Sequence, residues 1–175
     1  VELLLGTELN IMNEQGEVDL SKDILKQLDI AIAIMHISCF QSERTIENIT
    51  KAYLRAMENE YVDIIGHPDD GRFPVDCVKF VKEAKKTGTL IEVNNSSLRP
   101  DGFRLNTKEN CRNILQECKK QRAMIVLGTD SHVDVDIAEY GYAIEVLREV
   151  DFPEELIANV TLEKLKLSLK RNKKV

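Results

Sequence analysis

Short apolar runs alternate along the chain with longer stretches whose apolar residues recur at helical spacing. The short runs are continuously apolar, which is typical of strands buried on both faces of a parallel sheet. They predict strands over Glu2–Glu8, Asp29–Ile37, Tyr61–Gly66, Thr89–Asn94 and Ala123–Gly128.

The longer stretches predict helices between these strands. In one of them Ile46, Ile49, Tyr53 and Met57 form an apolar stripe, as expected for a helix that packs on a core. Strands and helices in alternation predict an α/β fold with right-handed crossovers. The expected helices cover Ser21–Leu28, Glu43–Glu60, Val75–Thr87, Thr107–Gln121 and Asp136–Val150, and Pro153 and Thr161 are expected to open two final helical segments.

A chain of 175 residues is long enough for one well-buried domain. Five strands fit either an open doubly wound sheet or part of a barrel. The chain starts with Val1 instead of methionine and enters a strand almost at once, which favours the barrel. We therefore expect residues 1–175 to form a single domain, an N-terminally truncated partial (β/α) barrel that lacks its first strands.

Composition narrows the class of protein. The formal charge of −6 argues against a nucleic-acid backbone as the main partner. No apolar run has the length of a membrane helix, and no secretion signal is visible. The cysteines lack CxxC spacing, so we expect them to be reduced residues of a cytoplasmic protein.

The three histidines all lie where a predicted strand ends. His36, His67 and His132 each follow an apolar run, Glu8 closes the first run, and Asp130 lies two residues before His132. A lone histidine in such a place is more often a hydrogen-bonded core residue. The shared position of all five side chains instead favours a metal site on the carboxyl-end rim of parallel strands, with zinc, manganese or iron as the metal.

Further polar residues are expected on the same rim. Asn94 and Glu92 face the same way, so they could hold ligand oxygens, orient the histidines or simply form a turn. Loop residues Arg72, Arg99 and Arg104 could each bind phosphate. No dinucleotide-binding, Walker or nucleophile-elbow motif is present.

The last candidate segment is GTDSH. Asp130 and His132 are expected to alternate along an extended backbone and to point to one side. Ser131 and His132 are then neighbours that point apart, which argues against a catalytic dyad.

Five segments together carry a family resemblance: GTELNI, IMHISCF, IIGHPDDGRFPVD, LIEVNNSS and LGTDSH. With them the chain resembles the PHP (polymerase and histidinol phosphatase) superfamily, and within it the YcdX-like phosphatases. The resemblance implies a distorted seven-stranded barrel with up to three metals at its strand ends. Glu8 would bridge two metals, His36 and His67 would complete one of these sites, Asp130 would bind the other bridged metal, and His132 the third.

The family's opening HxH motif and two further early histidines have no counterpart in this sequence. Only the site of Glu8, His36 and His67 keeps all its expected protein ligands. The resemblance implies a phosphoric-monoester hydrolase that attacks a small phosphorylated substrate with a metal-activated water. Asp130 and His132 are the predicted catalytic residues, and Asn94, Arg99 and Arg104 the predicted substrate-binding residues.

Two alternatives stay open. One is a nuclease or polymerase-associated PHP domain, against which the acidic charge counts. The other is a catalytically incomplete fragment with vestigial metal positions. An incomplete barrel would also expose apolar strand edges and favour a homo-oligomer.

Overall fold

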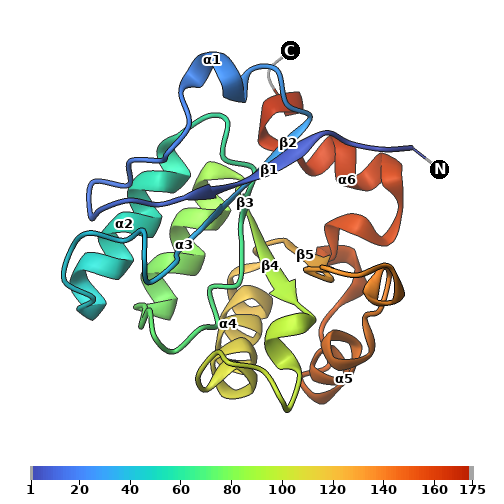
Figure 1. The fold of residues 1–175 in the computed structure, drawn as a ribbon. Helices are drawn as coiled ribbons and strands as arrows, with labels where there is room; N and C mark the ends of the chain where they lie inside the picture. Colours follow the sequence, from blue (N-terminus) through green and yellow to red (C-terminus); the bar gives the residue numbers. More distant parts are fainter. Residues whose placement is uncertain (1, 174–175) are drawn as a thin grey trace.

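The computed structural model describes residues 2–173; Val1, Lys174 and Val175 lie outside it. The chain forms an α/β fold around one parallel sheet (Figure 1). All four strand pairings are parallel, so the carboxyl ends of the strands share one edge of the sheet. In the sheet, chain order is kept: β1 (Gly6–Asn10), β2 (Ile30–Ile34), β3 (Ile64–Ile65), β4 (Leu90–Asn94) and β5 (Ile125–Gly128).

The helices lie between the strands as predicted. Figure 1 shows α2, α3, α4 and α5 following one another around the sheet, with α6 apart from them. Local capping explains two of the starts, since the side chains of Thr45 and Asp76 accept bonds from backbone N–H groups in the first turns of α2 and α3. The bounds are α1 (Lys22–Leu25), α2 (Ile46–Glu58), α3 (Cys77–Thr87), α4 (Thr107–Gln121), α5 (Gly141–Glu149) and α6 (Leu162–Ser168).

One predicted helix begins later than expected. The prediction from Asp136 is wrong because Ala138 has a φ of 64°, which no α-helix accommodates. A short 3₁₀ turn over Asp134–Asp136 comes first, and the α-helix starts at Gly141. Residues 131–139 therefore form a loop after β5.

The order of the strands explains where the main core lies. Each right-handed crossover advances the sheet in the same direction, which places the connecting helices on one face. The buried residues Ala33, Ile65 and Ile91 of that face belong to the same apolar cluster as Tyr53 and Phe80 of the helices. The sheet is open among the described residues, with β1 and β5 as its edges, so closure into a barrel is not shown.

The opposite face of the sheet is divided into two halves. Near the amino ends of the strands, Ile64, Leu90 and Val126 form a second apolar cluster with Leu169, against which Leu165 of α6 packs. Toward the carboxyl ends the same face carries polar side chains instead. This polar half is available for a functional site.

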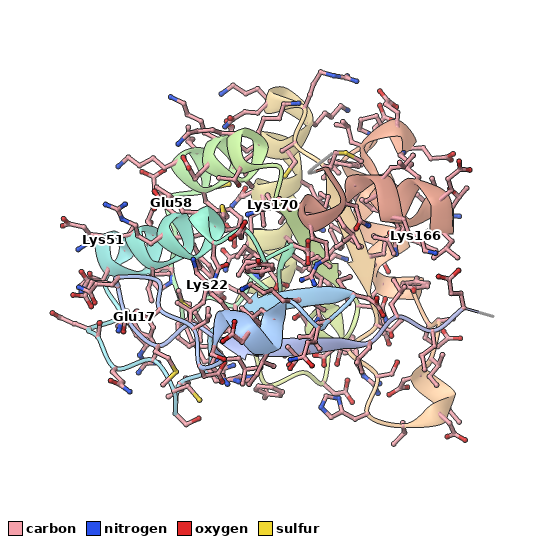
Figure 2. All side chains as sticks on the ribbon, turned by 90° about the horizontal axis from the view of Figure 1, so that it is seen from above. Glu17, Lys22, Lys51, Glu58, Lys166 and Lys170 are labelled. Carbon is pink, nitrogen blue, oxygen red and sulfur yellow. The ribbon has the colours of Figure 1, made fainter. Side chains whose placement is uncertain are left out.

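The last described residues tie the chain to the amino-end side of the sheet. Arg171 forms an ion pair with the fully buried carboxylate of Asp63. Lys170 donates hydrogen bonds to the backbone carbonyls of Met57 and Asn59 at the end of α2 (Figure 2). These contacts attach the final turn to residues far away in the sequence.

Two further expectations can be compared with the structure. All four cysteines are free, and Cys111 and Cys118 are buried in the core. Within residues 2–173, no helix combines the length and the apolar character needed to cross a membrane.

Candidate functional site

The carboxyl edge of the sheet gathers the residues that the strand ends predicted. His36 and His67 follow β2 and β3 by two residues, Asn94 ends β4, and Asp130 follows β5 by two residues. Glu8 lies in the middle of β1, so the prediction that it ends the first strand is wrong, because the strand starts and ends later than the apolar run indicated. Burial raises the pKa of Glu8, the nearby carboxylate of Asp130 raises it further, and His36 opposes the rise. These groups therefore act on one another electrostatically.

His67 is the most enclosed of the three histidines. Its backbone has a φ of 32°, its side chain is buried, and neither ring nitrogen has a hydrogen-bond partner. Its ring centroid lies 5.8 Å from that of His36. Burial lowers the pKa of His67 to about 4, and the positive charge of Arg104 adds to this effect. The imidazole is therefore neutral near pH 7, the form that binds metal ions.

The carboxylate of Glu92, in β4, binds the backbone of His67 after the neighbouring strand β3. Its Oε2 accepts a hydrogen bond of 2.8 Å from the backbone N–H of His67. A Cβ at Gly128 would overlap Oε1 of Glu92, and one at Gly66 would lie 3.3 Å from Oε2. Gly128 therefore leaves room for the carboxylate, whereas a Cβ at Gly66 would first meet the side chains of Ile34 and Ile32. Burial raises the pKa of Glu92 to about 7.

Two side chains hold Asp130 in place. Asn94 Nδ2 donates to Asp130 Oδ2 at 3.3 Å and to Glu92 Oε2 at 3.2 Å. Arg104, with only 8% of its side chain exposed, donates from Nη2 to Asp130 Oδ2 at 3.1 Å and from Nη1 to Ser97 at 2.9 Å. Asn94 and Arg104 thus orient the predicted site, and their contact with substrate stays a prediction.

Arg99 differs from Arg104. Its side chain is exposed and pairs with Asp101 at 3.3 Å and with Asp136 at 3.6 Å. These contacts link the loop after β4 to the loop after β5. They leave Arg99 outside the network around Asp130, and a role in binding substrate stays a prediction.

The backbone after β5 corrects one expectation. Asp130 has a φ of 50°, so the predicted extended backbone of this segment is wrong, although Nδ1 of His132 still lies 3.7 Å from Oδ1 of Asp130. His132 is 85% exposed, and its Nδ1 lies 3.0 Å from the backbone oxygen of Asp130. Ser131 donates its hydroxyl to Thr129 and not to His132, in agreement with the absence of a catalytic dyad.

Asp69, two residues after His67, is a candidate site residue that the sequence reasoning missed. Its carboxylate is buried, and neither oxygen has a hydrogen-bond partner. Burial raises its pKa to about 7, and the nearby carboxylates of Glu92 and Asp70 contribute. Burying a carboxyl group without a partner costs stability, so core packing does not explain Asp69. The sequence feature that could have pointed to Asp69 is the acidic pair that directly follows His67 and Pro68.

The side chains supply suitable metal donors without forming a complete ligand set. Among residues 2–173, no three His, Cys, Asp or Glu side chains are grouped closely enough to hold a metal ion. The unpartnered imidazole of His67 and the carboxylates of Glu8 and Asp130 are nevertheless donors that zinc, manganese and iron accept. His36 is exposed, and its Nδ1 lies 2.9 Å from Oδ1 of Asn10. Imidazole nitrogens and carboxylate oxygens are thus the types of donor that fit a zinc, manganese or iron ion.

Comparison with known proteins gives the family. No protein-family model matches the chain. A probable phosphatase of Thermoanaerobacter sp. (strain X514) is 41% identical over 174 residues, which is 99% of this chain and 70% of that protein. Probable phosphatases of Clostridium novyi and Clostridium acetobutylicum are 42% and 39% identical over all 175 residues, again 70% of each relative. The chain belongs to the family of these probable phosphatases.

Proposed function

We propose that this protein is a phosphatase that hydrolyses small phosphate monoesters with the help of divalent metal ions. The observation that carries the proposal is His67, a buried imidazole with two unpartnered nitrogens that follows β3 at the same edge of the sheet at which Asp130 follows β5. The names of the relatives support the reaction class, since they are probable phosphatases. The proposal adds metal dependence and a monoester substrate to that class.

Five residues would hold the metal ions: Glu8, His36, His67, Asp130 and His132. A bound zinc, manganese or iron ion would lower the pKa of a water molecule and neutralise charge on the phosphate. His36 and His132 are exposed, so their rings can turn without disturbing the core. We therefore place the more rigid part of the site at His67.

The other residues of the site position these donors. Glu92 fixes the backbone of His67, and Asn94 fixes Asp130. Arg104 would offset the negative charge of Asp130, which would otherwise repel an anionic phosphate. Such fixed, enclosed charges are more effective than charges in water because they need no reorganisation during the reaction.

The test is hydrolysis of a small aryl phosphate with added manganese or zinc. His67→Ala is expected to lower kcat/KM by about 100-fold or more and to reduce the metal content found by elemental analysis, because a primary donor is lost. Lys51→Ala, on the exposed side of α2, is the control and should keep both at wild-type levels. Wild-type activity in His67→Ala would overturn the proposal, as would release of nucleotides from single-stranded DNA without monoester hydrolysis.

A further inference from the structure

The two loops beside the candidate site carry large apolar side chains that are exposed. In the loop after β4 these are Phe103 and Leu105, and in the loop after β5 they are Val133, Val135 and Ile137. Connecting loops are usually polar, and exposed apolar side chains that gather beside a polar site are typical of ligand-binding surfaces. The ion pair between the two loops, from Arg99 to Asp136, keeps these surfaces next to each other.

Phe103 is the most distinctive of these residues. It is 73% exposed, whereas Phe40, Phe73 and Phe80 are buried in the core. Phe152 is partly buried against the same core, so the burial of apolar surface explains the other four phenylalanine rings and not this one. An aromatic ring that is largely open to solvent still has most of its surface available for a ligand.

Two arginines hold this exposed ring in place. The guanidinium carbon of Arg72 lies 5.0 Å from the centroid of Phe103, and that of Arg104 lies 5.2 Å from it. These distances are within the range of cation–π contacts. Both arginines are themselves anchored, Arg72 by Asp70 at 2.9 Å and Arg104 by Asp130 at 3.1 Å.

The same contacts connect the ring to the candidate site. Arg104 contacts Phe103 on one side and the carboxylate of Asp130 on the other. A single guanidinium group thus separates the aromatic surface from a predicted metal ligand. A phosphate group beside Asp130 would place the first atoms of its carbon part near Phe103.

We propose that Phe103 contacts the carbon part of the substrate and selects phosphate monoesters with a flat apolar or aromatic face over short, fully hydroxylated ones. The inference rests on the proposed phosphatase function and names its substrate class. Flat apolar groups pack well against an exposed aromatic ring, while hydroxyl groups would lose water there without gaining a hydrogen bond. The phosphate end of the substrate would bind at the candidate metal site, so the ring would distinguish substrates by their carbon part.

The experiment compares kcat/KM for a naphthyl phosphate and for glycerol 2-phosphate. Phe103→Ala is expected to lower the ratio of the two values by about 10-fold, chiefly through KM for the naphthyl ester, since apolar contacts discriminate on this scale. Phe103→Leu should restore part of the ratio because it restores apolar surface. Leu167→Ala removes an equally exposed apolar side chain on α6, and its ratio should match that of the wild type.

The outcomes separate the two proposals. If the wild type hydrolyses neither ester with added manganese or zinc, the phosphatase proposal fails, and this inference fails with it. If the wild type hydrolyses both and Phe103→Ala leaves the ratio unchanged, only the inference on substrate class is overturned. An unchanged ratio combined with an altered size-exclusion profile would instead assign Phe103 to a protein contact.

Discussion

Two buried arginine–aspartate pairs lie at opposite ends of the sheet, and they have very different surroundings. At the amino end, Arg171 Nη2 lies 2.6 Å from Asp63 Oδ2. Asp63 also accepts a bond of 3.1 Å from the backbone N–H of Ala31, and Arg171 also donates to the backbone carbonyls of Leu28 and Tyr61. This network satisfies both charged groups with protein partners.

At the carboxyl end, Arg104 and Asp130 form a comparable pair, but polar groups close to Arg104 have no partners. The ring nitrogens of His67 and the carboxylate oxygens of Asp69 make no hydrogen bonds. Native proteins leave few buried polar groups unsatisfied, and those few need an explanation. The amino end of the sheet thus holds a fully satisfied network that stabilises the fold, whereas the carboxyl end holds buried polar groups whose lack of partners lowers stability.

The largest expected effect concerns the amino-end pair. Asp63→Ala would leave the charge of Arg171 buried without its carboxylate, and breaking a buried pair in this way costs about 3–5 kcal/mol. Urea unfolding measures the loss. The control is Asp23→Ala, which breaks an exposed pair with Lys26 and should cost about 1 kcal/mol or less. Equal losses in the two variants would contradict the stabilising role of the Asp63–Arg171 pair.

The next effect concerns the unpartnered carboxyl group of Asp69. The pKa of Asp69 is about 7 in the folded protein, above the ordinary value of 3.8 that applies to the unfolded chain. Asp69 therefore makes its full contribution to the free energy of unfolding only below about pH 4, where both states are protonated. As the pH rises from 4 to 7, the folded chain keeps a proton that the unfolded chain loses. Each pH unit in this window therefore weakens folding by about 1.4 kcal/mol through this group.

Asp69→Asn should flatten this dependence of unfolding free energy on pH. The measurement is urea unfolding at pH 5 and pH 7 with a chelator present, so that metal binding does not contribute. Glu92→Gln is the parallel variant, because the pKa of Glu92 is also raised to about 7. A slope in Asp69→Asn equal to that of the wild type would show that Asp69 is ionised in the folded protein.

The sequence predicted the residues at the carboxyl ends of the strands much better than the contacts at their amino ends. Continuous apolar runs are local features, so the five strands and the histidines that follow them were predicted to within a few residues. The parallel arrangement then brought these strand ends to one edge. The pair of Asp63 and Arg171 joins residues 108 positions apart, and no local pattern marks such a contact.

The candidate site shows the same limit at the level of single residues. The left-handed backbone at Asp130 has no glycine to signal it, so the segment was expected to be extended. Arg104 was predicted as one of three equivalent loop arginines. Its burial against Asp130 depends on how the loop after β4 folds back, which only tertiary structure determines.

The smallest expected effect on stability comes from a substitution beside Glu92. It tests how tightly the Glu92 side chain packs near the carboxyl ends of the strands. Gly128→Ala would place a Cβ against the Glu92 carboxylate, and overpacking of this kind costs about 1–3 kcal/mol. Because Glu92 binds the backbone of His67, metal content should fall as well. Gly141→Ala is the matched control, since a Cβ there meets no atom within 4 Å, and it should leave metal content unchanged. If both glycine variants unfold at the wild-type urea concentration and keep the same metal content, Glu92 does not depend on the space at Gly128. The carboxyl ends of the strands would then tolerate an added methyl group as readily as the exposed start of α5 does.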